Sequence, residues 1–172
     1  MTSIGTCALV APGEGAAIEL GLGRPTIKVG PPVCTQIGIV ESELPPGGGF
    51  RIPHWHDDLY EVFYVLEGEI EYLLDGQWCP APAGTTVFIP AGIVHAFRNA
   101  TEHPARHLVI GPPGALGLIA ELGEQPRDRW AEVHERHRSH FAAGEPGERH
   151  AGSGAGAPSG HTGQLAPSGH TG

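Results

Sequence analysis

The stretch GGFRIPHWHDDLYEVFYVLEG, residues 48–68, decides the fold of this chain. Its second half is rich in β-branched and aromatic residues and ends at Gly68, a pattern typical of a buried β-strand closed by a turn. Its first half carries His54 and His56, separated by one residue. Because side chains alternate along a strand, both imidazoles are expected on one face, where they can chelate one ion. Glu61 begins the next strand, and a carboxylate at the head of a buried strand needs a compensating partner.

A second stretch, GTTVFIPAGIVHAFRN at residues 84–99, supplies another histidine in a similar setting. Pro90 and Gly92 favour a tight turn, and His95 follows on a strand of its own. Three histidines and one carboxylate projecting into one interior leave one or two coordination positions for water, substrate or dioxygen. The sequence therefore predicts a reactive metal site with four ligands: His54, His56, Glu61 and His95.

The chain around these stretches has the rhythm of an all-β protein. It contains 27 Gly and 17 Pro in 172 residues, which favours many turns and short elements. Between Val33 and Pro113, apolar segments of strand length alternate with Pro and Gly punctuation. Seven or eight strands at this spacing indicate a barrel or a sandwich.

The two stretches together resemble the motifs of the cupin superfamily, and the chain is similar to small single-domain cupins of the quercetin dioxygenase type. The first motif is filled by Gly48, His54, His56, Glu61 and Gly68, and the second by Gly84, Pro90, Gly92, His95 and Asn99. The resemblance implies a double-stranded β-helix, or jelly roll, with the metal near one mouth. Asn99 is expected to brace the backbone.

We expect four segments along the chain. They are an N-terminal arm (1–32), the cupin barrel core (33–113), helices packed on the barrel (114–143) and a disordered tail rich in Gly, Ala, Ser, Pro and His (144–172). The tail contains the heptapeptide APSGHTG twice and lacks the apolar residues that would offset its ordering entropy.

Two C-terminal helices are predicted, over Ala115–Gly123 and Arg127–Ala143. The second carries an apolar stripe expected to pack on the barrel wall, made up of Trp130, Val133, His134, His137 and Phe141. On such a helix, His134, His137 and His140 would be spread around the axis, so we do not expect them to hold one ion.

The substrate pocket is predicted from strand alternation. If Glu61 points inward, Phe63 and Val65 share its face; Phe97 shares the face of His95, and Ile52 that of His54. The predicted substrate-binding residues are Ile52, Phe63, Val65 and Phe97. Filling of the core is an equally good explanation for the two phenylalanines.

The resemblance to quercetin dioxygenase implies one divalent ion (iron, nickel, cobalt, manganese, copper or zinc) and dioxygen-dependent cleavage of a hydroxylated aromatic or enol substrate. Glu61 would then be both ligand and catalytic base. Two alternatives stay open, since the ligand set does not choose a reaction. One is a non-oxidative isomerase or cyclase in which a zinc ion acts as Lewis acid, and the other is a cupin that binds a small molecule without turnover.

Charge and composition limit the partners. A net charge of −9 argues against nucleic acid and against anionic membranes as partners, which leaves a small molecule as the expected partner.

The three cysteines are widely spaced and predict reduced thiols. The first residues lack the features of a signal peptide, so we expect a cytoplasmic protein. The cupin resemblance also implies a homodimer.

Overall fold

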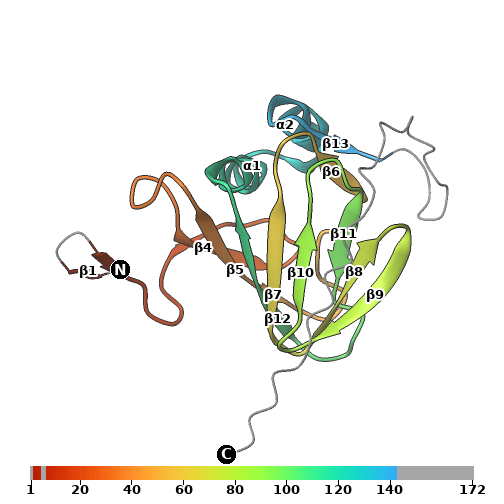
Figure 1. The fold of residues 1–172 in the computed structure, drawn as a ribbon, viewed down its shortest axis with the longest axis horizontal. Helices are drawn as coiled ribbons and strands as arrows, with labels where there is room; N and C mark the ends of the chain where they lie inside the picture. The colour runs from red at the N-terminus through yellow and green to blue at the C-terminus, as the bar shows by residue number, and fades with distance from the viewer. Residues whose placement is uncertain (1, 5–6, 143–172) are drawn as a thin grey trace, which may run out of the picture.

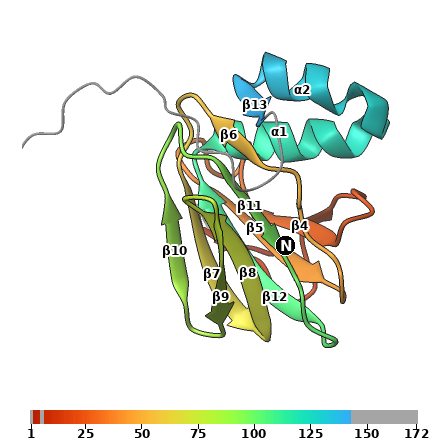
Figure 2. The same ribbon diagram turned by 90° about the vertical axis from the view of Figure 1, so that its right-hand side faces the viewer.

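Two antiparallel sheets face each other in the computed structural model, which describes residues 2–4 and 7–142 (Figures 1 and 2). Within these residues one sheet has the strand order β10-β7-β12-β5-β4-β3 and the other the order β13-β6-β11-β8-β9. A separate two-stranded sheet pairs β1 with β2. The all-β fold with C-terminal helices is confirmed, whereas the predicted tail lies outside the described residues.

The strands are β1 (Thr2–Ile4), β2 (Cys7–Leu9), β3 (Ala16–Ala17), β4 (Arg24–Val29), β5 (Gly38–Leu44), β6 (His54–His56), β7 (Glu61–Glu67), β8 (Glu69–Leu74), β9 (Gln77–Pro82), β10 (Thr86–Ile89), β11 (His95–Arg98), β12 (Ala105–Gly111) and β13 (Ser139–Phe141). The helices are α1 (Pro113–Glu124), the 3-10 turn η1 (Arg127–Arg129) and α2 (Trp130–Arg136).

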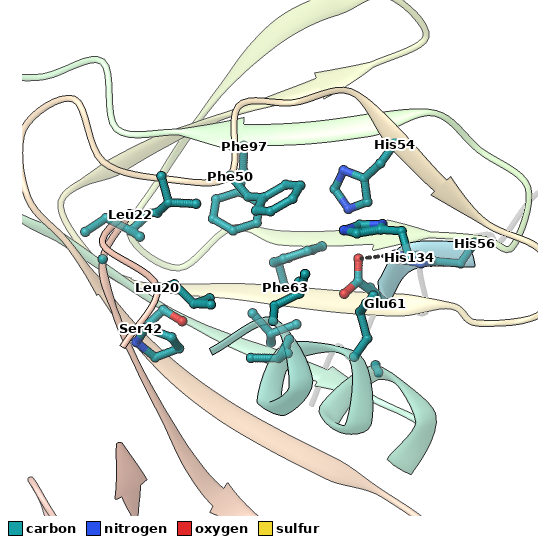
Figure 3. Close-up of a pocket in the computed structure, with 18 residues that line it drawn as sticks. Leu20, Leu22, Ser42, Phe50, His54, His56, Glu61, Phe63, Phe97 and His134 are labelled. Atoms are coloured by element: carbon teal, nitrogen blue, oxygen red, sulfur yellow. Dashed lines mark ion pairs between the residues drawn. The ribbon is translucent and has the colours of Figure 1, made fainter. Parts of the chain in front are cut away.

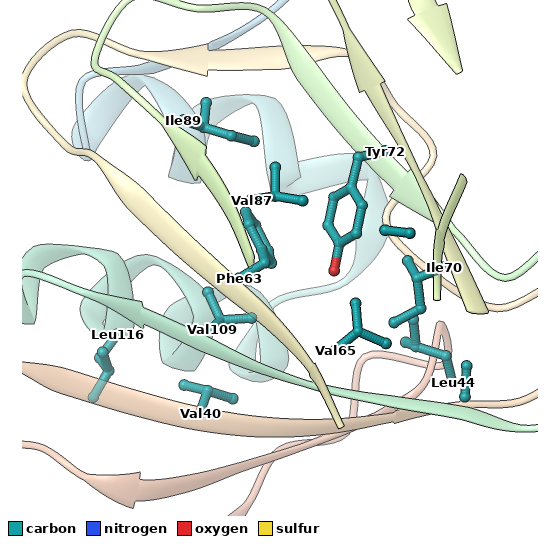
Figure 4. Packing of buried hydrophobic residues seen from close by; sticks show 12 residues of the cluster. Val40, Leu44, Phe63, Val65, Ile70, Tyr72, Val87, Ile89, Val109 and Leu116 are labelled. Atoms are coloured by element: carbon teal, nitrogen blue, oxygen red, sulfur yellow. The ribbon is translucent and has the colours of Figure 1, made fainter. Parts of the chain in front are cut away.

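The core lies between the sheets because β5, β7 and β12 each bury every second residue. Figure 4 shows side chains from both sheets meeting there, among them Phe63 and Val65 of β7 and Tyr72 of β8. Phe63 and Tyr72 have ring centroids 5.1 Å apart. This aromatic and aliphatic packing sets the distance between the sheets and thus the width of the site at their end.

The predicted N-terminal arm is partly built into the sheet. β4 pairs with β5 from Arg24↔Glu43 onward, and β3 pairs with β4. The arm thereby covers the edge of β5 that would otherwise expose unpaired backbone groups. The sheet thus begins before residue 33, where the sequence placed the start of the barrel core.

The second C-terminal helix is shorter than predicted. It ends at Arg136, and Arg138 has a φ angle of 53°, in the left-handed region that terminates helices. Residues Ser139–Phe141 then form β13 beside β6, with Ser139 opposite His56 and Phe141 opposite His54. The prediction of a helix to Ala143 is wrong because pairing with the open edge of β6 outweighs helix continuation.

The three C-terminal histidines do not share one helix. His134 is buried on α2, His137 follows that helix and binds Glu121 (Nε2 to Oε2, 2.7 Å), and His140 on β13 lies 3.1 Å from Asp57. The three therefore lie in separate surroundings and do not converge on one point. Both helices lie across the end of the sandwich that carries β6 and β13 (Figure 2).

Asn99 braces the turn after β11, as expected from its motif position. Its Nδ2 atom donates to the carbonyl oxygens of Leu44 (3.0 Å) and His103 (2.7 Å), and its Oδ1 atom accepts from the backbone N–H of Thr101 (3.0 Å). Nearby, Gly49 has a φ angle of 115°, and a Cβ atom there would lie 2.6 Å from the carbonyl oxygen of Phe97. Both residues hold the loop before β6 close to β11.

One histidine is part of the core itself. His107 on β12 is fully buried, and its Nδ1 atom lies 2.8 Å from the hydroxyl of Tyr72. Burial lowers the pKa of His107 to about 3, so the imidazole is neutral in the folded protein at neutral pH.

We predict that His107 makes the protein less stable in mild acid. The unfolded imidazole binds a proton below pH ~6.5 whereas the folded one does not until about pH 3, so stability falls as the pH drops through this window. The loss approaches about 1.4 kcal/mol per pH unit for this one group. Urea unfolding at pH 7.5 and pH 5 should show a smaller drop for His107→Gln than for the wild type. The exposed His103→Gln serves as control, and equal drops in all three proteins would contradict the prediction.

Candidate metal centre

Four buried side chains from both sheets converge at the end of the sandwich beneath the helices. His54 and His56 come from β6 and His95 from β11, which pairs with β6 through His95↔His54. Glu61 enters from β7 of the opposite sheet. One potential ligand atom from each of these residues lies within 4.8 Å of all the others. The structure therefore brings together the predicted ligand set.

Each imidazole is fixed at its Nδ1 atom. For His54 the Nδ1 atom lies 2.9 Å from the carbonyl oxygen of Ile52, and for His95 it lies 2.9 Å from that of Ile93. The Nδ1 atom of His56 lies 2.6 Å from the hydroxyl of Ser139 on β13. When Nδ1 carries the hydrogen of these bonds, Nε2 presents its lone pair to the centre, as metal-binding histidines require.

The set fits a divalent ion. Ligands about 2.1 Å from one ion lie at most about 4.2 Å apart, so closing this site needs shifts of less than about 1 Å. The Nε2 atom of His56 is buried and has no hydrogen-bond partner among the described residues, whereas its other nitrogen is satisfied. The unpaired Nε2 nitrogen points at a carboxylate and two further histidines. A metal ion bound among them would give it the partner that it lacks.

Electrostatics favour the metal-binding forms of His54 and Glu61, whereas His95 holds its proton more tightly because it bonds to Glu61. Burial and the neighbouring His95 and His56 hold the pKa of His54 well below its usual value, so its imidazole is neutral. Burial alone would raise the pKa of Glu61, but the attraction of the neighbouring His56 and His95 imidazoles outweighs burial and holds that pKa well below the usual range. Burial lowers the pKa of His95, yet its bond to Glu61 (Nε2 to Oε2, 2.8 Å) raises it overall. Glu61 is therefore a carboxylate.

The centre opens into a mostly apolar cavity of about 80 Å³. In Figure 3, His54, His56, Glu61 and His134 gather at one end, and Leu20, Leu22 and Ser42 lie at the other. Between them lie Phe63 and Phe97, whose rings are tilted by 53° with centroids 5.6 Å apart. Leu118 and Leu122 of α1 also line the cavity.

Two of the predicted substrate-binding residues, Phe63 and Phe97, line this cavity, and two do not. Ile52 is 44% exposed and lies on a different surface depression, because β6 begins only at His54 and strand alternation does not extend back to Ile52. Val65 points inward as predicted, but it is packed deeper in the core.

Sequence reasoning missed several residues of the site. Leu20 and Leu22 precede the predicted barrel, and Phe50 lies in the irregular loop before β6, so no strand pattern points to them. From the sequence, His134 is assigned to an apolar stripe and to a set of three histidines that is not expected to hold an ion, and neither assignment places it in the pocket. Nothing in the sequence pointed to Ser139 as part of the site, because the strand that contains it was predicted as helix.

Comparison with known proteins agrees with this geometry. The profile of the Cupin domain matches residues 40–111, a range that contains the four ligands. Residues 40–111 of the chain therefore form a Cupin domain.

Relatives of this cupin carry different activities in their names. Polyketide synthase CurC of Streptomyces cyaneus is 38% identical over 70 residues, which are 38% of this chain and 46% of that protein. Quercetin 2,3-dioxygenase of Bacillus subtilis is 36% identical over 89 residues, which are 52% of this chain and 26% of that protein. The cupin chain thus spans less than half the length of either relative.

Among solved structures, the polyketide cyclase RemF of Streptomyces resistomycificus matches with a TM-score of 0.51 at 24% sequence identity. The match covers 66% of this chain and 80% of that one. At this identity the match supports the fold.

No described helix of the cupin has the length and apolarity needed to cross a membrane.

We predict one divalent ion per chain at this centre. Replacing any one of its histidines by alanine should lower metal affinity at least about tenfold, because even the loss of a supporting residue typically costs ~10–100-fold. Elemental analysis and chelator competition measure the effect, with the exposed His103→Ala as control. Stoichiometric metal in a His54→Ala, His95→Ala double variant would contradict this.

Ser139 should matter for metal affinity although it is not a ligand. Ser139→Ala removes the partner of His56 Nδ1 and leaves that ring free to turn, so affinity should fall by about 10–100-fold. Ser42→Ala is the matched control, since Ser42 is buried at the same cavity and bonds to none of the described ligand rings. Equal affinities for the two variants would refute a role for Ser139.

Proposed function

We propose that this cupin is a metal-dependent dioxygenase that cleaves a hydroxylated aromatic or enol substrate. The observation that carries the proposal is a ligand set open to an apolar cavity whose walls include Phe63 and Phe97. Such a cavity excludes water and favours a flat, mostly apolar compound with an oxygen atom directed at the ligands. The similarity to quercetin 2,3-dioxygenase over 52% of the chain supports the reaction class.

Glu61 would take the substrate's hydroxyl proton. Its Oε2 atom lies 2.8 Å from His95 Nε2 and 3.6 Å from His56 Nε2, which keeps the carboxylate ionised and oriented. His54, His56 and His95 would act only as ligands. After cleavage of a carbon–carbon bond, both atoms of dioxygen enter the products and Glu61 returns its proton.

When bound, a redox-active divalent ion would supply Lewis acidity toward the substrate oxygen and the redox chemistry that dioxygen requires. The phenylalanine rings would orient the substrate, and the helices α1 and α2 contribute Leu118, Leu122 and His134 to the cavity wall. The homodimer and the cytoplasmic location stay predictions from the sequence.

A second candidate is a non-oxidative cyclase or isomerase. The similarity to polyketide synthase CurC at 38% identity favours it, since the same ligand set can hold a zinc ion that polarises a carbonyl. Oxygen consumption separates the two candidates.

The dioxygenase proposal predicts oxygen uptake by protein loaded with iron, nickel, cobalt or manganese and given flavonol or catechol-like substrates. Glu61→Gln should lower the rate per bound metal ion by ~10²–10⁴-fold, the usual contribution of a general base. An oxygen electrode measures uptake, and metal analysis of each sample normalises it. If no loaded form consumes oxygen while the zinc form converts a carbonyl substrate, the second candidate replaces the first.

A further inference from the structure

His134 on α2 is a polar side chain in an apolar position. It is 1% exposed, and neither of its ring nitrogens has a hydrogen-bond partner among the described residues. A buried polar group without a partner typically costs ~1–3 kcal/mol. A phenylalanine would pack there without this cost, so the imidazole calls for an explanation beyond packing.

The other buried histidines of the described chain differ from His134. His54, His56 and His95 are each held at Nδ1 and belong to the metal centre, and His107 is held by Tyr72. His134 is outside the group of ligands that could share an ion. Among the buried histidines of the described residues, His134 is thus the one in which neither ring nitrogen has a hydrogen-bond partner.

The ring of His134 is nevertheless well fixed. It lies 4.2 Å from the ring of Phe141 and is stacked on that of Phe50 at 5.8 Å, measured between centroids. The ring of His54 lies edge-on at 5.7 Å. His134 also lines the cavity on which the metal centre opens (Figure 3). Aromatic packing therefore holds an unpaired hydrogen-bonding group close to the ligands and at the cavity surface.

We propose that His134 is a substrate-binding residue whose imidazole hydrogen-bonds an oxygen atom of the substrate. The substrate is then a small, otherwise apolar compound with two oxygen functions, one directed at the metal centre and the other at His134. This inference rests on the metal centre of the proposed function and deepens it. Burial, reinforced by the nearby His56, His137 and His140, lowers the pKa of His134 to about 4, so the ring is neutral at pH 7 and can donate from one nitrogen and accept at the other.

Catechol and phenol test this inference because they differ by one hydroxyl. Calorimetric titration of cobalt-loaded protein without dioxygen gives a Kd for each probe. The wild type should bind catechol more tightly than phenol, and His134→Phe should reduce this preference about fivefold, the usual effect of one lost hydrogen bond. His134→Gln keeps a donor and an acceptor and should retain more of the preference. His137→Phe is the matched control, since His137 binds Glu121 and does not line the cavity.

The inference is overturned if His134→Phe keeps the wild-type preference, if His137→Phe reduces it equally, or if the wild type does not favour catechol. The phenol Kd and a thermal melt show whether each variant keeps its fold and cavity. If His134→Phe has lost them, His134→Leu, which also lacks hydrogen-bonding atoms, takes its place, and an unchanged preference in that variant overturns the proposal. Because no turnover is measured, failure of the dioxygenase proposal appears in oxygen uptake and failure of this inference in the ratio of affinities. Metal analysis of each sample tests the metal centre separately.

Discussion

The three imidazole rings of the metal centre converge because each is held by a hydrogen bond at Nδ1, and the rest of the site depends on these bonds. Two of the partners are carbonyl groups two residues earlier in the chain, at Ile52 and Ile93. The third, Ser139, is 83 residues away and arrives only when β13 pairs with β6. The ligand geometry is therefore partly local and partly a product of the tertiary fold.

Burying a carboxylate is costly, and the fold compensates for it with the same rings. Glu61 stands at the head of β7, where the two sheets face each other, and both His56 and His95 lie within ion-pair distance of it. The apolar core beneath, with Phe63 next to Tyr72, fixes how far the sheets stand apart. The core thus sets the distance across which Glu61 meets the histidines of the opposite sheet.

Much of the fold and the ligand set was readable from the sequence because their signals are local. Alternation along β5, β7 and β12 and the spacing from His54 to Glu61 are encoded within a few residues. The errors have a different origin. Residues 139–141 were predicted as helix because their pairing with β6 is long-range, and Ile52 was assigned to the pocket because a strand was extended back past His54.

The ligands of the metal centre could be predicted from local sequence signals, whereas much of the cavity wall is assembled by the tertiary fold. The segment that matches the Cupin domain, residues 40–111, supplies the ligands and the two phenylalanines. Most of the remaining cavity wall, including Leu20, Leu22 and His134, comes from before and after that segment. Similarity within the matched segment therefore bears on how the centre is built, and relatives with different named activities can share it. The flanking elements supply Leu20, Leu22 and His134 to the cavity wall, so changes in them can alter the shape and polarity of the cavity without changing the ligands.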